Sequence, residues 1–220
     1  MAKECHLHDH YLARAAISLQ LWSGVSLSDY FEAHIFNPLG MHDTGFKLKD
    51  DKSGRLIDLF QKSPEGFTKV TEPIVEGNPV DYPLIEEVYF SGGAGLVSTV
   101  YDYAKFLRIF TGQGKVGDCR FLSSKTIEML STNQLSSAAI NNGDPNLRFG
   151  LGTALITTEN SHITTVSPGS LYWAGAFNTQ YWVDPKENVI GLIYTQQHLP
   201  DSYFDLGSVF KNVIYSQLEP

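Results

Sequence analysis

The sequence predicts an α+β fold in which helices pack against one antiparallel sheet. Three observations lead to this class. Apolar residues recur at helical spacing in the first half of the chain, over residues 11–22, 28–36 and about 99–110. Strand-like patterns then follow one another between residues 149 and 196, separated by turn residues. A last amphipathic helix is expected over residues 203–218.

The first two helices are expected to have clear boundaries. The helix over residues 11–22 is followed by Gly24, a residue that commonly ends a helix. The helix over residues 28–36 has Ser28 as its candidate N-cap, because a serine hydroxyl can accept a hydrogen bond from the first turn. Pro38 is expected to close this helix.

The middle of the chain is expected to be less regular. Residues 37–41 form a tight loop, and residues 46–90 combine short strands with irregular structure. A helix then begins at a capping box formed by Thr99 and Asp102. The apolar face of that helix consists of Tyr103, Phe106, Leu107 and Phe110.

The last third of the chain carries the predicted sheet. A short helix over residues 124–130 and a polar loop over 136–146 precede it. The expected strands cover residues 149–158, 162–166, 171–183 and 188–196, with a hairpin turn at 184–188 between the last two. The segment VIGLIY, residues 189–194, is apolar on both faces and is therefore expected to be a central strand.

Composition fits a soluble globular protein of one domain or a large piece of one. The 220 residues are 42% hydrophobic and 18% charged. A formal net charge of −8 argues against nucleic acid or an anionic membrane as the main partner. No run of 18 apolar residues is present to span a membrane. Two cysteines give no disulfide framework, which slightly favours the cytoplasm and leaves the compartment open.

The organisation predicted along the chain is simple. Residues 1–10 form an N-terminal tail, whose cysteine and histidines match no zinc-finger spacing, so no metal site is predicted. Residues 11–220 form a single domain portion, mainly helical or irregular over 11–147, with the sheet and the last helix over 148–220. No phosphate-binding glycine motif is present, and no cofactor is expected.

One stretch, LYWAGAFNTQYWVDP over residues 171–185, carries the candidate site. Gly175 lies in the middle of this predicted strand. A glycine weakens a strand, and it often marks a place where a ligand or another backbone comes close. Ordinary sheet packing remains the other explanation for the large aromatic residues Trp173 and Trp182.

Four segments occur in the order seen in one superfamily: HIFNPLGMHDTGF, GGAGLVSTVYDYAKFLRIF, RFGLGTAL and YWAGAFNTQYWVDPKENVIGLIYTQ. They resemble the serine β-lactamase and penicillin-recognising superfamily, in particular class C β-lactamases and the related esterases and transesterases. The resemblance runs from about Tyr11 to the final helix. It implies a β-lactamase/transpeptidase-like fold that is incomplete at its N-terminus in this chain.

The resemblance also implies a serine acyl-transfer site built from three motifs, S-x-x-K, Y-x-N or Y-x-S, and K-T-G, H-x-G or W-x-G. Trp173-Ala174-Gly175 matches the third motif. Gly175 would then leave room for an acyl group, and the amide of Ala176 would face the developing oxyanion.

The substrate-binding residues implied by this motif are aromatic. Tyr172, Phe177 and Tyr181 lie beside Trp173 in the sequence and would favour an apolar acyl or aryl ester. Trp173 also replaces the lysine that helps to hold the carboxylate of a β-lactam, which indicates the same preference.

The other two motifs have no convincing match. The pair Ser208 and Lys211 gives the one S-x-x-K pattern, but it follows the W-x-G strand and lies on the expected C-terminal helix, so we interpret it as a chance match. Tyr89-Phe90-Ser91 has the form Y-x-S, but it leads directly into the GGAGL loop. The chain is therefore expected to lack a nucleophile and to be inactive alone.

Two functions remain open from the sequence. The first is a serine hydrolase or acyltransferase that acts on a small ester or amide once a missing segment completes it. The second is a non-catalytic, truncated homologue that binds a ligand or a protein. In the superfamily, N-terminal strands pair with the last strand of the sheet, so residues 189–196 are expected to form an unprotected apolar edge. Such an edge favours a homodimer or a complementary chain as partner.

Overall fold

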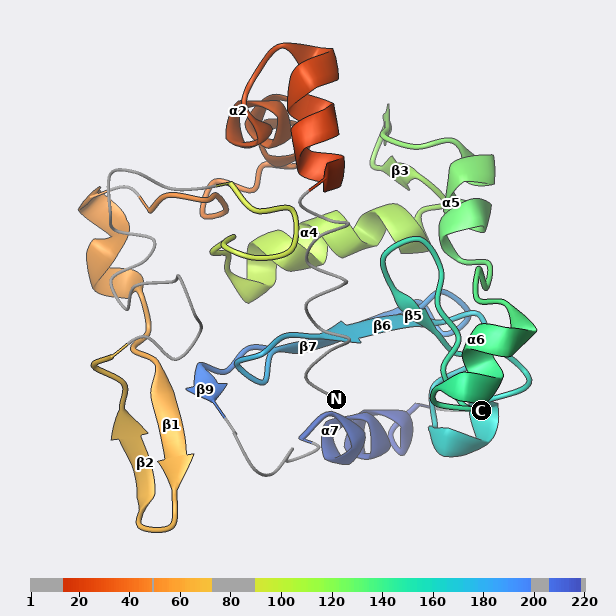
Figure 1. Ribbon diagram of the computed structural model, residues 1–220. Coiled ribbons are helices and arrows are strands. Elements are labelled where there is room, and N and C mark those ends of the chain that lie inside the picture. The colour runs from red at the N-terminus through yellow and green to blue at the C-terminus, as the bar shows by residue number, and fades with distance from the viewer. Residues whose placement is uncertain (1–13, 49, 73–89, 199–205, 219–220) are drawn as a thin grey trace. The chain divides into compact units, whose positions relative to one another are not determined.

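The computed structural model describes residues 14–48, 50–72, 90–198 and 206–218, and the predicted N-terminal tail lies outside them. The chain forms two compact units. The first consists of residues 1–58 and 70–106, and the second consists of residues 59–69 and 107–220 (Figure 1). Mixed helices and antiparallel strands agree with the predicted α+β class.

The first described helix covers residues 14–23 and ends where the sequence predicts. Gly24 follows it with a φ of +73°, a left-handed conformation that glycine adopts without strain. Its N–H donates back to the last turn of the helix at 3.0 Å. Ala16 of this helix packs with Leu27 and Phe46 in the hydrophobic core of the first unit.

Helix α2 (Leu27–Phe31) begins one residue before the predicted range, and its N-cap lies two residues before the predicted one. Ser26, and not Ser28, is the N-cap, because its Oγ accepts a hydrogen bond from the N–H of Asp29 at 3.1 Å. Ser28 lies inside the helix. Both serines stand before an apolar helical face, so the spacing alone did not distinguish them.

Pro38 does not end the helical run. The chain continues through a π-helical turn, η1 (Glu32–Phe36), into α3 (Asn37–Leu39). Pro38 lies in the first turn of α3, where an N–H is not needed. Gly40, with a φ of +66°, ends the run, so the loop predicted over residues 37–41 is mostly a last helical turn.

A longer helix, α4 (Val100–Thr111), follows a 3₁₀-helix, η2 (Asp50–Arg55). The N–H of Asp102 donates to Thr99 Oγ1 at 3.2 Å, which confirms Thr99 as the cap. The Asp102 carboxylate accepts a hydrogen bond from the N–H of Asp43 at 2.7 Å and thereby holds a distant loop of the first unit.

Short elements precede the main sheet of the second unit. A small hairpin is formed by β3 (Lys115–Val116) and β4 (Cys119–Arg120). Helix α5 (Ser124–Leu130) has the predicted bounds. The predicted polar loop over residues 136–146 instead contains a helix, α6 (Ser137–Asn142), capped by Ser136.

The main sheet has four antiparallel strands in the order β5-β6-β7-β8. They are β5 (Ala154–Leu155), β6 (Leu171–Ala174), β7 (Gln180–Asp184) and β8 (Val189–Ile193). The predicted strand over 171–183 is therefore two strands of one hairpin. The predicted strand over 162–166 is wrong, because a 3₁₀-helix, η3 (Ser161–Ile163), begins there. The turn at residues 184–188 is confirmed.

Strand β8 is not central among the described strands. It pairs with β7 alone in the order given above and so forms one end of the sheet. A second sheet, unforeseen in the sequence, contains β2 (Gly66–Lys69), β1 (Phe60–Ser63) and β9 (Gln197–His198), and β1 pairs with β9 in parallel.

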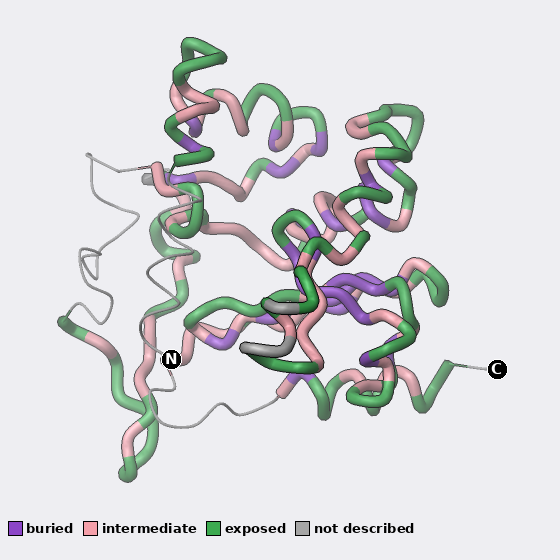
Figure 2. Tube along the Cα trace, turned by 45° about the vertical axis from the view of Figure 1, so that its right-hand side comes forward, coloured by how far each residue is buried: buried purple, intermediate pink, exposed green. Residues whose placement is uncertain are grey.

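Helix α7 (Leu206–Tyr215), predicted as the last amphipathic helix, lies along one face of the main sheet (Figure 1). Buried residues concentrate in the strands of this sheet (Figure 2). The indole of Trp182 is fully buried and meets the Phe210 ring edge-on, with 5.7 Å between centroids. Gly191 lies opposite Trp182 on β8, and a Cβ there would overlap the indole. Gly191 is thus required by packing.

No helix within the described part of the chain is both long and apolar enough to cross a membrane.

Candidate functional site

The W-x-G motif ends at a tight turn between β6 and β7. The N–H of Gly175 donates to Thr179 O at 2.8 Å, and Gly175 O accepts from the N–H of Asn178 at 3.1 Å. Asn178 has a φ of +58°. Residues 176–178 therefore form a three-residue hairpin loop, in which a turn is followed by the left-handed residue Asn178. Gly175 therefore lies at the end of a strand and not in its middle. A Cβ at residue 175 would collide with Thr179 Oγ1, so packing within the hairpin also explains why this residue is a glycine.

The residues that follow β8 hold this turn in place. Thr195 Oγ1 donates to Phe177 O at 2.8 Å and lies 3.0 Å from Asn178 O. The N–H of Gln197 also donates to Phe177 O, at 3.1 Å. Ala176, the predicted oxyanion residue, is exposed at the tip of the turn. Sequence reasoning missed the roles of Thr195 and Gln197, although they directly follow the apolar VIGLIY strand.

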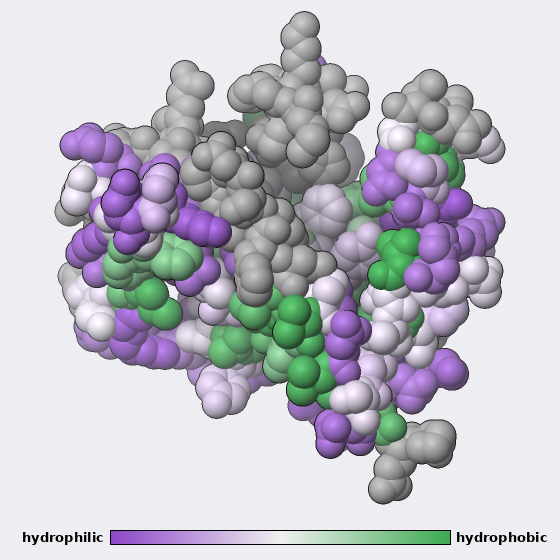
Figure 3. All heavy atoms as spheres, turned by 90° about the horizontal axis from the view of Figure 1, so that it is seen from below, coloured by the Kyte–Doolittle hydropathy of each residue, from purple (hydrophilic) through white to green (hydrophobic). Residues whose placement is uncertain are grey.

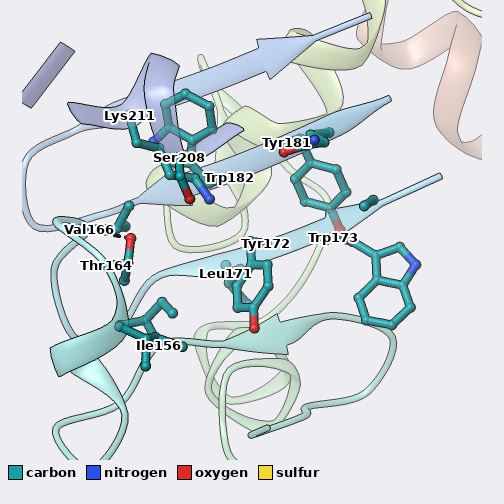
Figure 4. Close-up of a pocket in the computed structure, with 13 residues that line it drawn as sticks. Ile156, Thr164, Val166, Leu171, Tyr172, Trp173, Tyr181, Trp182, Ser208 and Lys211 are labelled. Atoms are coloured by element: carbon teal, nitrogen blue, oxygen red, sulfur yellow. Dashed lines mark hydrogen bonds between the residues drawn. The ribbon is translucent and has the colours of Figure 1, made fainter. Parts of the chain in front are cut away.

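A cavity of about 360 Å³ opens between the sheet and α7 (Figure 4). Its lining comes from β6, β7, α7 and the segment after β5. The lining residues are Ile156, Ile163, Thr164, Val166, Leu171, Tyr172, Trp173, Ala174, Gln180, Tyr181, Trp182, Ser208 and Lys211.

Three of the six predicted site residues line this cavity. Tyr172, Trp173 and Tyr181 line it together with the S-x-x-K pair of α7. Gly175, Ala176 and Phe177 form the turn beyond the end of β6 and are not among the lining residues described above. The structure thus separates the predicted oxyanion donor from the pair interpreted as a chance match.

Side chains alternate across β6, so the aromatic residues divide between the two faces. Tyr172 lies opposite Trp182, on the face covered by α7. The Lys211 ammonium lies 5.6 Å from the centroid of the Tyr172 ring and 5.4 Å from that of Trp182. Trp173 contacts Phe149 edge-on at 5.0 Å, and Figure 4 shows its indole at the far end of the cavity from Lys211.

A buried carboxylate fastens α7 to the sheet. Asp184, fully buried at the end of β7, accepts hydrogen bonds from the Tyr215 hydroxyl at 2.8 Å and the Ser167 N–H at 3.0 Å. Two further N–H groups, of Lys186 and Glu187, donate to it at 3.1 Å. Burial raises the pKa of Asp184, but these hydrogen bonds outweigh burial and leave the pKa below its ordinary value.

The first unit contains a different polar cluster around Asp43. Arg55 forms two hydrogen bonds with this carboxylate at 2.9 Å, and the Lys52 ammonium lies 2.6 Å from it. These contacts, led by Arg55, hold the pKa of Asp43 well below its ordinary value. The cluster borders a cavity of only about 80 Å³, which is too small for an organic substrate. We therefore interpret it as structural.

The antiparallel sheet, its covering helix and the W-x-G hairpin together fit a β-lactamase-like fold. The chain belongs to the beta-lactamase family, whose sequence profile matches residues 11–209.

Curated relatives agree with this membership. The chain is 29% identical over 191 residues to protein Rv1367c of Mycobacterium tuberculosis, covering 83% of this chain and 46% of that protein. It is 25% identical over 214 residues to the lovastatin esterase of Penicillium rubens, covering 88% of this chain and 51% of that protein. The chain thus spans about half the length of the curated relatives it matches.

A solved structure shows the same fold. Simvastatin synthase (LovD) from Aspergillus terreus superposes with a TM-score of 0.76 at 21% identity, covering 93% of this chain and 54% of the synthase. The predicted β-lactamase/transpeptidase-like fold is therefore confirmed.

Proposed function

We propose that this chain supplies the oxyanion turn, the supporting sheet and part of the pocket wall of a serine acyl-transfer site for a small ester or amide. The observation that carries the proposal is the β6–β7 turn. It places the exposed Ala176 directly after the W-x-G motif, and Thr195 fixes the turn through two backbone carbonyls. A fixed amide donor is what a developing oxyanion requires. Family membership supports the reaction class.

We also propose that the nucleophile is not among these residues and that the chain alone is inactive. An acyl-transfer site needs its nucleophile and its oxyanion donor to reach one carbonyl group. Ser208 and Lys211 line the cavity beside α7, whereas Ala176 does not. Lys211 also lies over two aromatic rings, which is a packing arrangement in its own right. These placements support a chance match for the S-x-x-K pair.

Covalent labelling tests this proposal. The chain is incubated with a fluorophosphonate and, separately, with a chromogenic short-chain ester, and its intact mass is then measured. We expect no adduct and no ester hydrolysis above that of buffer. An adduct on any serine would contradict the proposal. The Ser208→Ala variant identifies the source of such an adduct, because loss of labelling in this variant would make Ser208 the nucleophile.

We further propose that the edge of β8 binds a complementary chain segment, and that the isolated chain self-associates through this edge. Strand β8 forms one end of the four-stranded sheet and is apolar on both faces. An unpaired apolar edge is a template for another strand. Light scattering over a concentration series should show association. The variant Leu192→Lys should reduce it, whereas Phe67→Lys, on the end strand β2 of the other sheet, should not. A monodisperse monomer at high concentration would contradict the proposal.

The alternative function is a non-catalytic module that binds a ligand or a protein. The cavity beside α7 favours it, because about 360 Å³ falls within the range of small-molecule sites. One experiment distinguishes the enzymatic function from the non-catalytic one. A mixture of the chain with a complementary segment would gain serine labelling only if the chain is part of an enzyme.

A further inference from the structure

Asn178 is the last residue of the hairpin loop between β6 and β7, and its backbone is left-handed. Its φ of +58° is one of three positive values among the described residues other than glycine, and the others belong to Gln113 and Asn188. Asparagine reaches this conformation more readily than most residues do. The residue at position 178 therefore decides whether the loop closes without strain.

The N–H of Asn178 controls the peptide group that carries the candidate oxyanion donor. It donates a hydrogen bond to Gly175 O at 3.1 Å. The C=O of Gly175 and the N–H of Ala176 belong to one peptide group, which is planar and trans, so they point in opposite directions. A hydrogen bond that fixes Gly175 O therefore also fixes the direction of the Ala176 N–H.

The side chain of Asn178 is held in turn by Gln180, the first residue of β7. Gln180 Nε2 donates to Asn178 Oδ1 at 3.1 Å, and the two residues are only 8% and 3% exposed. Hydrophilic residues are spread widely over the face of the molecule shown in Figure 3, where water can satisfy them. Water cannot replace a lost partner so easily in the interior. The buried hydrogen bond between the two amides therefore ties the loop to β7.

The segment after β8 supports the other side of the loop. Thr195 Oγ1 lies 2.8 Å from Phe177 O and 3.0 Å from Asn178 O. These contacts hold the carbonyl groups of the loop, whereas the Gly175–Ala176 peptide group is held through the N–H of Asn178. The direction of the Ala176 N–H thus depends on where Asn178 is fixed.

We propose that Asn178 and Gln180 are positioning residues of the oxyanion turn. Their buried hydrogen bond holds Asn178 in place, so that its N–H keeps the Ala176 N–H in one direction. A donor that is aimed before the reaction needs no reorganisation when charge develops on the substrate oxygen. This inference rests on the proposed role of Ala176 in acyl transfer, and both residues act through Ala176 and not on the substrate.

Backbone ¹⁵N relaxation of the whole labelled chain tests the pair. The order parameter of the Ala176 N–H should be about 0.85 in the unchanged chain, the value of a rigid amide. Gln180→Met removes the donor and keeps the side-chain length, and Asn178→Gly removes the acceptor and keeps the left-handed backbone. Each variant should lower the order parameter of Ala176 to about 0.6 or below. The double variant should lower it no further, because both changes break the same hydrogen bond.

Asn188→Gly is the matched control, because Asn188 is a left-handed, exposed asparagine in the β7–β8 turn. It should leave Ala176 as rigid as in the unchanged chain. The N–H of Val183, within β7, reports on the sheet and should keep its order parameter in every variant. A rigid Ala176 in both Gln180→Met and Asn178→Gly would overturn the proposal, and so would an equal loss of order at Val183. The order parameters do not depend on serine labelling, so failure of this proposal and failure of the acyl-transfer proposal are seen in different measurements.

Discussion

Asp43 in the first unit and Asp184 in the second are both aspartates with several hydrogen-bond donors, but the donors differ. Asp43 is partly exposed, with 28% of its side chain accessible, and its side-chain partners Lys52 and Arg55 are cations. Asp184 is fully buried, and its donors are backbone N–H groups and the hydroxyl of Tyr215. Both carboxyl groups nevertheless have a pKa below the ordinary value.

The comparison shows two ways to keep a carboxylate ionised. Near the surface, opposite charges do so, but solvent and salt screen them and side-chain ordering offsets part of the gain. In the interior, neutral donors satisfy the carboxylate, and no mobile ion can replace them. The interior arrangement is therefore expected to contribute more to stability, and it fixes the position of α7, one wall of the cavity beside this helix.

The largest expected effect comes from Asp184→Ala. Removal of this buried carboxylate leaves four donors without an acceptor, and the free energy of unfolding should fall by about 3 kcal/mol or more. Urea denaturation followed by tryptophan fluorescence measures it. Asp118→Ala, in the exposed turn between β3 and β4, is the matched control and should change stability by less than about 0.5 kcal/mol.

Asp43→Ala should lower the free energy of unfolding by less than Asp184→Ala does, because water can solvate Lys52 and Arg55 once the carboxylate is gone. If the two substitutions destabilise the protein equally, the distinction between charged and neutral donors does not govern stability here.

Acid should weaken both arrangements. An unfolded aspartate has a pKa of about 3.9. Because folding lowers the pKa of Asp43 and Asp184, each contributes stability that is present above this value and is lost as the pH falls through the folded-state pKa. We expect the unfolding midpoint to fall as the pH is lowered below about 4, and this fall to be smaller in Asp43→Asn and Asp184→Asn.

Salt separates the two sites in the same experiment. In about 1 M sodium chloride, the difference in unfolding midpoint between the unchanged chain and Asp43→Asn should become smaller. At this concentration salt screens charges that are more than about 3 Å apart. The difference for Asp184→Asn should persist. A salt-independent effect at Asp43 would show that its cations act mainly through hydrogen-bond geometry.

Local signals in the sequence predicted much of this fold. Helix α5 and the turn at residues 184–188 have their own caps and turn residues, and both were found where expected. Pairings between distant segments were missed, among them the parallel contact of β1 with β9. No local pattern encodes such a pairing, because it depends on how the rest of the chain is folded.

The site was predicted in the same partial way. Residues 171–183 were predicted as one strand with Gly175 inside it and not as a hairpin, because the three-residue turn interrupts the aromatic pattern without a proline or an Asn-Gly pair. The glycine with the clearer structural requirement is Gly191, which only the packing of Trp182 reveals. The meeting of Tyr172 with Lys211 likewise depends on the docking of α7.

A third aspartate gives the smallest effect and completes the comparison. Asp29 is near the start of α2, where the Ser26 hydroxyl donates to its carboxylate at 2.7 Å and accepts from its N–H at 3.1 Å. The donor is neutral, as at Asp184, but the pair is exposed. Ser26→Ala should therefore lower the free energy of unfolding by only about 1 kcal/mol, the usual contribution of an N-cap. Ser28→Ala, inside the helix, should leave it almost unchanged. If Ser26→Ala and Ser28→Ala lower the stability measured by thermal unfolding equally, Ser26 does not cap α2. If Ser26→Ala lowers it as much as Asp184→Ala does, burial does not set the size of these effects.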